Sequence, residues 1–141
     1  MLMRLLTGPV LLSFIAGLLL VAPAPAQAGI ARCEVRAFEP RRVTPTDPDA
    51  GIEGTLTCDP DALPSRFTNT VCLQVKKGDR FVDAGCCRVI EVRVSTRPWN
   101  MCAEGWPLLA GTHKYRTRAR AVRLSTGSAE TDYSPSRTFT K

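Results

Sequence analysis

Residues 115–121 alternate side chains that suit a protein core with positively charged side chains. Successive side chains of a β-strand point to opposite faces, so this pattern predicts a strand with one face on a core and the other in water. We therefore expect a central strand of an antiparallel β-sandwich here. The inner face would carry Tyr115, Thr117, Ala119 and Ala121, and the outer face Lys114, Arg116, Arg118 and Arg120.

Shorter segments with strand character recur along the chain between residues that favour turns. We expect strands at residues 30–38, 51–58, 70–77, 80–86, 88–95 and 133–140. Gly78-Asp79 has the composition of a two-residue hairpin turn, which would place Lys77 opposite Arg80 and Leu73 opposite Ala84. The segments expected to be irregular are residues 39–49, 97–107 and 125–131. Because the pattern shows no helical periodicity, the sequence predicts an all-β antiparallel sandwich of about seven strands.

The first 28 residues have the order of a secretory signal peptide. Arg4 precedes an apolar run at residues 5–21, and the small-residue site Ala26-Gln27-Ala28 follows, so we expect cleavage after Ala28. An uncleaved membrane anchor is the alternative, but the run is shorter than the roughly 20 residues of a membrane-spanning helix. We expect an extracellular domain at residues 29–141, with no membrane span after cleavage.

The chain is basic, with 19 Lys and Arg against 13 Asp and Glu. Arg4 is the only charged residue before the expected cleavage site, so the exported chain would carry a net charge of +5. This charge favours anionic partners without requiring them, because a charged surface also keeps a secreted protein soluble.

All six cysteines follow the expected signal peptide, and an even number in an exported chain predicts three disulfides. The alternation of the flanking residues places Cys33 and Cys58 on the inner faces of neighbouring strands, so we expect them to pair. A bond between the adjacent residues Cys86 and Cys87 is disfavoured by disulfide geometry, which leaves two arrangements. The hairpin register expected above favours Cys72 with Cys87 and Cys86 with Cys102.

Two other roles for the cysteines, redox chemistry and zinc binding, find little support. The chain has no Cys-x-x-Cys or His-x-x-x-His spacing and only one histidine, His113. A lone histidine without a Gly-x-Ser-x-Gly motif also offers no pair of nucleophile and base. We therefore expect no metal, no cofactor and no catalytic residues.

The end of the chain resembles the last two strands of a fibronectin type III domain. The residues that carry the resemblance are Leu109 with Gly111-Thr112, Tyr115 to Val122, Gly127, and Ser134 to Thr140. Upstream, residues 55–60 are similar to the second strand of that family and residues 75–79 to its third. The resemblance implies a fibronectin type III-like or immunoglobulin-like sandwich. It also implies that Tyr115 is a tyrosine corner, with a buried ring and a hydroxyl group bonded to nearby backbone.

Four same-face cations on one strand repel one another, and folding does not require them. The row Lys114, Arg116, Arg118 and Arg120 is therefore a candidate site for an anionic polymer such as a polysaccharide, a glycosaminoglycan or a nucleic acid. The alternative is that acids on neighbouring strands, such as Glu91 or Glu53, neutralise the row.

Trp99 and Trp106 form the second candidate, because exposed aromatic side chains on a disulfide-anchored loop suit protein or sugar recognition. The alternative is that both rings cover an open edge of a small core. The partners expected from the two candidate sites are an anionic polysaccharide or an extracellular protein.

A protease inhibitor is the alternative function. Residues 55–58, Thr-Leu-Thr-Cys, are similar to a strand of the subtilisin-inhibitor family, and residues 100–103 would then take the place of its reactive loop. The reading that we favour is a secreted, disulfide-bonded module that acts by binding.

Overall fold

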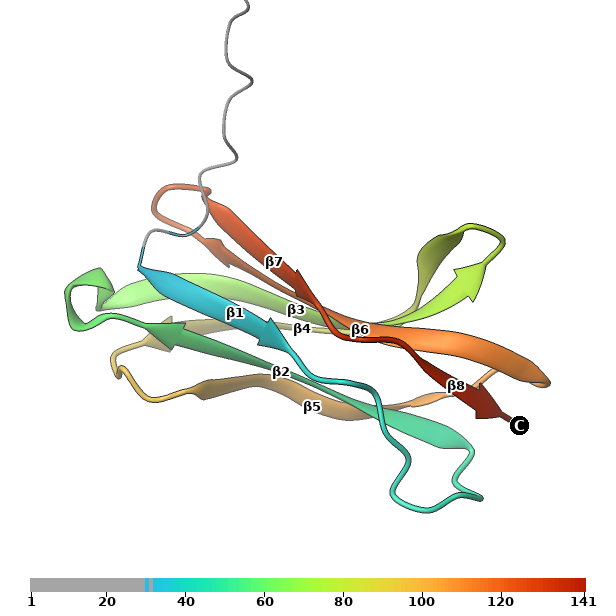
Figure 1. Cartoon of the computed structure of the whole chain (residues 1–141). Helices are drawn as coiled ribbons and strands as arrows, with labels where there is room; N and C mark the ends of the chain where they lie inside the picture. Colours follow the sequence, from blue (N-terminus) through green and yellow to red (C-terminus); the bar gives the residue numbers. More distant parts are fainter. Residues whose placement is uncertain (1–29, 31) are drawn as a thin grey trace, which may run out of the picture.

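A computed structural model describes residue 30 and residues 32–141, and these form two facing antiparallel β-sheets (Figure 1). One sheet has the order β1 (Cys33–Ala37), β2 (Asp49–Cys58) and β5 (Trp99–Pro107). The other has the order β4 (Arg80–Arg93), β3 (Ser65–Lys77), β6 (Thr112–Arg123) and β7 (Ala129–Tyr133), and β8 (Arg137–Thr140) also pairs with β6. A short 3-10 turn, η1 (Pro60–Ala62), joins β2 to β3. The all-β sandwich is confirmed, with eight strands in the described residues.

The expected signal peptide lies in residues 1–28, outside the described residues. Within the described residues, no helix is long and apolar enough to cross a membrane.

Strand β6 holds the central place expected for residues 115–121. It pairs with β3 on one side and with β7 and β8 on the other. Its side chains alternate as predicted, because Tyr115, Thr117, Ala119 and Ala121 are buried while the four cations lie on the outer face. The end of the chain differs from the prediction. Residues 129–131, expected to belong to a turn, lie in β7, and the strand expected at 133–140 is shortened to β8.

The core between the sheets is built from modest side chains. Its largest fully buried apolar members include Leu56, Phe67, Leu73, Met101 and Tyr115. Small residues bring the sheets close together at one point, where a Cβ atom on Gly54 would lie 2.8 Å from the Cβ atom of Ala119.

Tyr115 has the environment that the resemblance implies. Its side chain is completely buried, and its hydroxyl oxygen accepts a hydrogen bond from the Leu109 backbone N–H at 3.0 Å. This bond ties the loop before β6 to the core.

We expect Tyr115→Phe to lower the free energy of unfolding by about 1 kcal/mol, because the Leu109 N–H loses its acceptor while the ring stays in place. Urea unfolding measures this loss. The packing of the ring at residue 115 against Phe139, whose ring centroid lies 5.9 Å away, should be the same in the variant. A neutral result for Tyr115→Phe would mean that the hydroxyl bond contributes nothing.

Two acids of β7 close one edge of the sandwich. Asp132 accepts a hydrogen bond from the Ala37 N–H at 2.8 Å, and Glu130 accepts one from the Val35 N–H at 3.4 Å. Partial burial raises the pKa of Glu130, the Val35 N–H opposes this shift, and the nearby charges of Glu34 and Asp132 add to it.

This raised pKa predicts that Glu130→Gln stabilises the protein at neutral pH. A carboxyl group with a raised pKa binds its proton more tightly in the folded state, so its contribution is most favourable at low pH and is lost as the pH rises through the folded pKa. In thermal unfolding, the melting temperature of Glu130→Gln should be higher than that of the wild type at pH 7 and close to it below about pH 4. The exposed Glu39→Gln serves as control, and a constant difference at all pH values would contradict the assignment.

Strands β3 and β4 form the expected hairpin, with Lys77 opposite Arg80 and Val75 opposite Val82. The register then shifts by one residue. Gln74 faces Asp83 but Leu73 faces Gly85, so Ala84 is an extra residue in a β-bulge and the predicted pairing of Leu73 with Ala84 is wrong. A one-residue shift turns every following side chain of β4 to the opposite face.

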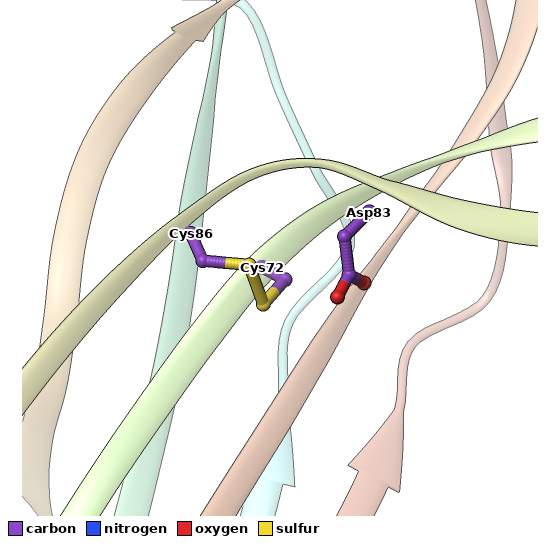
Figure 2. A group of neighbouring side chains, drawn as sticks. All are labelled: Cys72, Asp83 and Cys86. Carbon is purple, nitrogen blue, oxygen red and sulfur yellow. A yellow bond between two sulfur atoms is a disulfide. The ribbon is translucent and has the colours of Figure 1, made fainter.

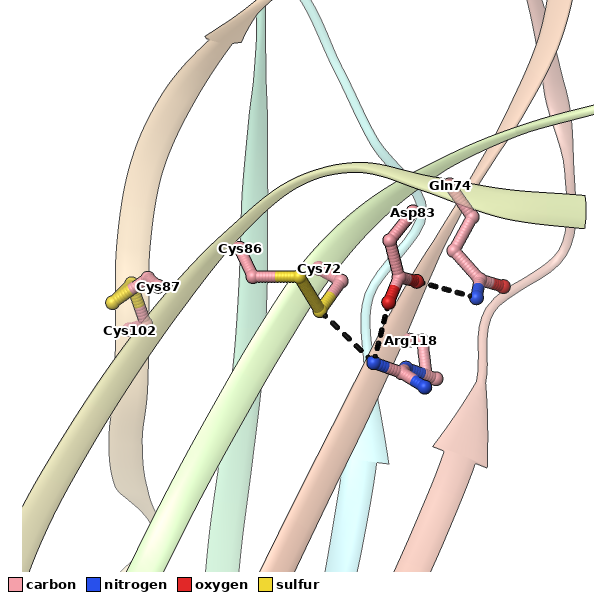
Figure 3. Close-up of a disulfide and its surroundings, with 7 residues drawn as sticks. All are labelled: Cys72, Gln74, Asp83, Cys86, Cys87, Cys102 and Arg118. Carbon is pink, nitrogen blue, oxygen red and sulfur yellow. Dashed lines mark hydrogen bonds and ion pairs between the residues drawn. A yellow bond between two sulfur atoms is a disulfide. The ribbon is translucent and has the colours of Figure 1, made fainter.

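The bulge changes the disulfide pairing. Cys33–Cys58 is confirmed. The other two bonds are Cys72–Cys86 and Cys87–Cys102 (Figure 3), so the predicted pairs Cys72–Cys87 and Cys86–Cys102 are wrong. After the shift, Cys86 lies directly opposite Cys72 in β3. Cys87 therefore takes the inner face and bonds across to β5 in the other sheet. Three disulfides are typical of proteins in an oxidising, extracellular environment.

Two further expectations about this region are corrected. The strand expected at residues 88–95 is not a separate one, because residues 88–93 are the second half of the continuous β4, which ends at Arg93. Residues 99–107, expected to be irregular, form β5, which pairs with β2 along its whole length and places its prolines outside or at the end of the strand.

Candidate functional site

The four outer cations of β6 do not form a uniform row. Lys114 and Arg120 are exposed, whereas Arg116 and Arg118 are half-buried by partners on neighbouring strands. Successive outer-face side chains of a strand lie about 7 Å apart, so each cation has different neighbours on the adjacent strands. These neighbours decide what each cation can bind.

Arg116 is held inside the protein's own contacts. Its guanidinium carbon lies 4.2 Å from the ring centroids of both Phe81 and Tyr133, and its Nε donates to Gln74 Oε1 at 2.8 Å. Both faces of the guanidinium are thus occupied. Arg116 serves the packing of the outer face and is not available to a ligand.

Arg118 is oriented by one acid and one sulfur atom. Its Nη2 donates to Asp83 Oδ2 at 2.8 Å and to Cys72 Sγ at 3.2 Å, while Gln74 Nε2 donates to the other oxygen of Asp83 (Figure 3). The Nε of Arg118 is buried and has no hydrogen-bond partner in the described residues. Asp83 therefore fixes the side chain and offsets part of its charge.

The acids expected to neutralise the row have other partners. Glu53 pairs with Arg41 at 3.3 Å, and Glu91 accepts a hydrogen bond from Asn69. The acid that does reach the row is Asp83, which the bulge at Ala84 leaves in the unshifted part of β4. Arg120 makes no hydrogen bond or ion pair within the part of the chain that the structure describes.

Arg118 and Arg120 line a surface hollow of about 610 Å³ between β6 and β7. Across β6, Arg118 faces Tyr133 and Arg120 faces Thr131. The hollow brings two guanidinium groups together with hydroxyl groups; its other lining residues are Gly127, Ser128, Ala129, Thr131 and Tyr133. The sequence pattern predicted the two cations but not the hydroxyl residues, because the pairing of β6 with β7 was not expected. Lys114 does not line this hollow.

Asp83 also lies beside the Cys72–Cys86 disulfide (Figure 2), and Glu104 lies beside Cys87–Cys102. In both groups the sulfur atoms are bonded to each other. A disulfide sulfur is not a thiolate, which is the form of cysteine that binds metal ions. These groups therefore offer a single carboxylate each.

The two tryptophans lie at opposite ends of β5 and have different surroundings. Trp99 is 42% exposed, and the Arg93 guanidinium lies 5.9 Å from its ring centroid. Trp106 is half-buried against the core and lies over Gly85 of β4, where it covers the gap between the sheets. Trp106 thus fits the covering role, whereas Trp99 remains an exposed aromatic surface.

We expect Gly85→Ala to lower the free energy of unfolding by about 2 kcal/mol, because the added methyl group displaces the Trp106 ring. A Cβ atom at residue 85 would lie 2.6 Å from Trp106 Cδ2. Urea unfolding measures the loss, and a red shift of tryptophan emission reports the displaced ring. Gly105→Ala is the matched control, since its nearest neighbour would be 3.7 Å away. Equal effects of the two substitutions would contradict this role of Trp106.

Residues 100–103 do not form an exposed loop. They lie in β5, paired with β2, and Met101 is 2% exposed. His113 is bonded through Nε2 to the backbone oxygen of Ala110 at 2.9 Å. Residues 100–103 therefore lack the exposed loop that the protease-inhibitor alternative requires.

No protein-family model, curated protein or solved structure matches this chain significantly.

Proposed function

We propose that this protein is a secreted binding module that holds an acidic group of an extracellular polysaccharide between Arg118 and Arg120. It acts by binding and not by catalysis. The observation that carries the proposal is the exposed Arg120, which has no counter-ion among the described residues and shares a hollow with the oriented Arg118.

The chemistry of the hollow favours a sulfate or carboxylate group on a sugar. Arg118 is already held in place by Asp83, so little side-chain entropy is lost when it accepts a ligand. Arginine presents a planar fork of donors that matches sulfate and carboxylate oxygens. The hydroxyl groups of Ser128, Thr131 and Tyr133 suit the hydroxyl groups of a saccharide.

A polysaccharide fits better than a nucleic acid. Binding of single strands relies on aromatic rings on which bases stack. Here the ring of Tyr133 lies against Arg116, which occupies one of its faces.

The proposed class is a fibronectin type III-like module. Support comes from the strands that carry the sequence resemblance, which are β2, β3, β6 and β8, and from the buried Tyr115 with its hydroxyl bond to Leu109. Export is supported by the disulfides and by the order of residues 1–28.

Binding of heparin oligosaccharide, measured by calorimetry at about 0.15 M salt, tests the site. We expect Arg120→Ser to weaken binding about tenfold, which corresponds to about 1.4 kcal/mol. Lys114→Ser is the matched control, because it removes the same charge from the same face of the same strand but lies outside the hollow. Polygalacturonate as a carboxylated probe and dextran as a neutral one define the recognised group.

Equal losses for Lys114→Ser and Arg120→Ser would show attraction by net charge alone and would refute the site. Binding of dextran as tight as that of heparin would refute an acidic ligand. Preference for single-stranded DNA of equal charge would replace the polysaccharide by a nucleic acid.

A further inference from the structure

The second half of β4 is an open edge of the larger sheet. Among the described residues β4 pairs only with β3, and no strand is hydrogen-bonded to its other edge. Near Gly85 and Cys87 this side is tied to β5 by the Trp106 ring and the disulfide to Cys102. Residues 88–94 lie beyond these links. An exposed strand edge is a template for pairing with another chain.

The outer face of this open segment is apolar. Ile90 and Val92 lie in β4 and Val94 directly follows its last residue, and the three side chains are 58%, 52% and 73% exposed. The bulge at Ala84 turns these residues outward. Val92 also borders an apolar hollow with Pro64 and Leu124. Three neighbouring β-branched side chains on an open edge favour contact with another protein surface.

The inner face of the same segment carries two opposite charges. Arg93 is 2% exposed, and its Nε and Nη2 atoms have no hydrogen-bond partner in the described residues. Glu91 is half-buried, and burial raises its pKa against the hydrogen bond from Asn69 and the charge of Arg93 in the same subunit, both of which lower it. Inward charges prevent most strands from pairing with an edge, because each charge would be left uncompensated.

We propose that a second copy of this chain pairs with the open edge of β4 in antiparallel fashion, with the two-fold axis at Val92. In this register Glu91 faces the partner subunit's Arg93, and Arg93 faces the partner subunit's Glu91. On the outer face, Val92 faces the partner's Val92 and Ile90 faces the partner's Val94. The same pairing covers the apolar side chains and gives the buried guanidinium an acceptor.

Neighbouring symmetric registers lack this complementarity. A two-fold axis at residue 91 would place Glu91 opposite the partner's Glu91. An axis at residue 93 would place Arg93 opposite the partner's Arg93. Like charges directly opposite each other destabilise a strand pair. The inward charges therefore select a copy of this chain in one register and exclude other strands.

Sedimentation equilibrium of the disulfide-bonded protein purified from culture medium, between about 1 and 200 µM, tests the proposal. We expect a dimer. The double variants Ile90→Lys/Val94→Lys and Ile90→Glu/Val94→Glu should each raise the dimer dissociation constant about 100-fold or more, because like charges then face each other across the axis. An equimolar mixture of the two variants should form a heterodimer, which native mass spectrometry identifies by mass.

Val43→Lys is the control, because Val43 is an apolar residue that is 90% exposed in the loop before β2. It should leave the dimer unchanged. Circular dichroism and thermal unfolding check that each variant is folded. A wild-type protein that stays monomeric at all concentrations would overturn the proposal. So would a wild-type dimer whose two charged variants fail to pair in the mixture, since another surface or register would then form the dimer.

Discussion

Replacing Cys87 and Cys102 together by alanine should lower the free energy of unfolding by about 3 kcal/mol, because the unfolded chain regains the freedom of a loop closed by residues 15 apart. Urea unfolding measures this loss. The disulfide joins β4 to β5 and is the only one of the three that connects the two sheets. Removing this disulfide should also weaken the packing of Trp106 between the two sheets.

Cys72→Ala/Cys86→Ala is a matched comparison, since that disulfide closes a separation of 14 residues within the β3–β4 hairpin. Chain entropy alone predicts nearly equal losses for the two pairs. An extra loss in Cys87→Ala/Cys102→Ala therefore reports the buried contact around Cys102. A larger loss of free energy of unfolding for Cys72→Ala/Cys86→Ala would contradict a structural role of the link between the sheets.

The single variant Cys102→Ala tests the pairing itself. It should leave one free thiol, at Cys87, which alkylation followed by fragmentation mass spectrometry can distinguish from Cys86. A label on Cys86 would instead support the pairing of Cys86 with Cys102, which an unbroken hairpin register predicts.

The alternation of residues 115–121 predicted the fold because it depends on one strand alone. The burial of Tyr115 follows from the same alternation, and Cys33–Cys58 was predicted because parity along two regular strands was sufficient. The other two disulfides depend on the register between β3 and β4, and one extra residue changed it. The isolated Gly85 was the available signal, because a glycine inside a strand pattern often marks a bulge or a close approach.

The candidate site was predictable only in part. The outer face of β6 follows from its own sequence, but the role of each cation depends on neighbours such as Phe81, Asp83 and Tyr133. Phe81 and Asp83 lie in the part of the hairpin whose register was predicted, but the sequence did not predict which strands flank β6. The four cations therefore looked equivalent, whereas their contacts divide them into one stacked, one acid-paired and two exposed side chains.

The two proposed properties are physically compatible. A two-fold axis that relates strands within one continuous sheet is perpendicular to that sheet, so the outer faces of both copies would point the same way. Two hollows beside Arg120 could then contact one long polysaccharide, and the second contact would be favoured by a high local concentration. The monomeric variants at residues 90 and 94 would give the affinity of a single hollow, and the difference from the wild-type dimer would give the gain from two contacts.

Arg116→Ala should lower the free energy of unfolding by about 2 kcal/mol, because it removes the group stacked between Phe81 and Tyr133 and leaves the nearly buried Gln74 without its donor. Lys114→Ala removes the same charge from an exposed neighbour and should change stability by less than about 0.5 kcal/mol. Urea unfolding of both variants gives the comparison.

Arg116→Lys separates the stacked geometry from the charge. A lysine keeps the positive charge but lacks the planar guanidinium group that lies against both rings, so it should recover only part of the lost stability. Full recovery would mean that charge alone matters at this position. If Arg116→Ala were as neutral as Lys114→Ala, the stacked pair of rings would contribute nothing, and Arg116 would be available to a ligand like its exposed neighbours.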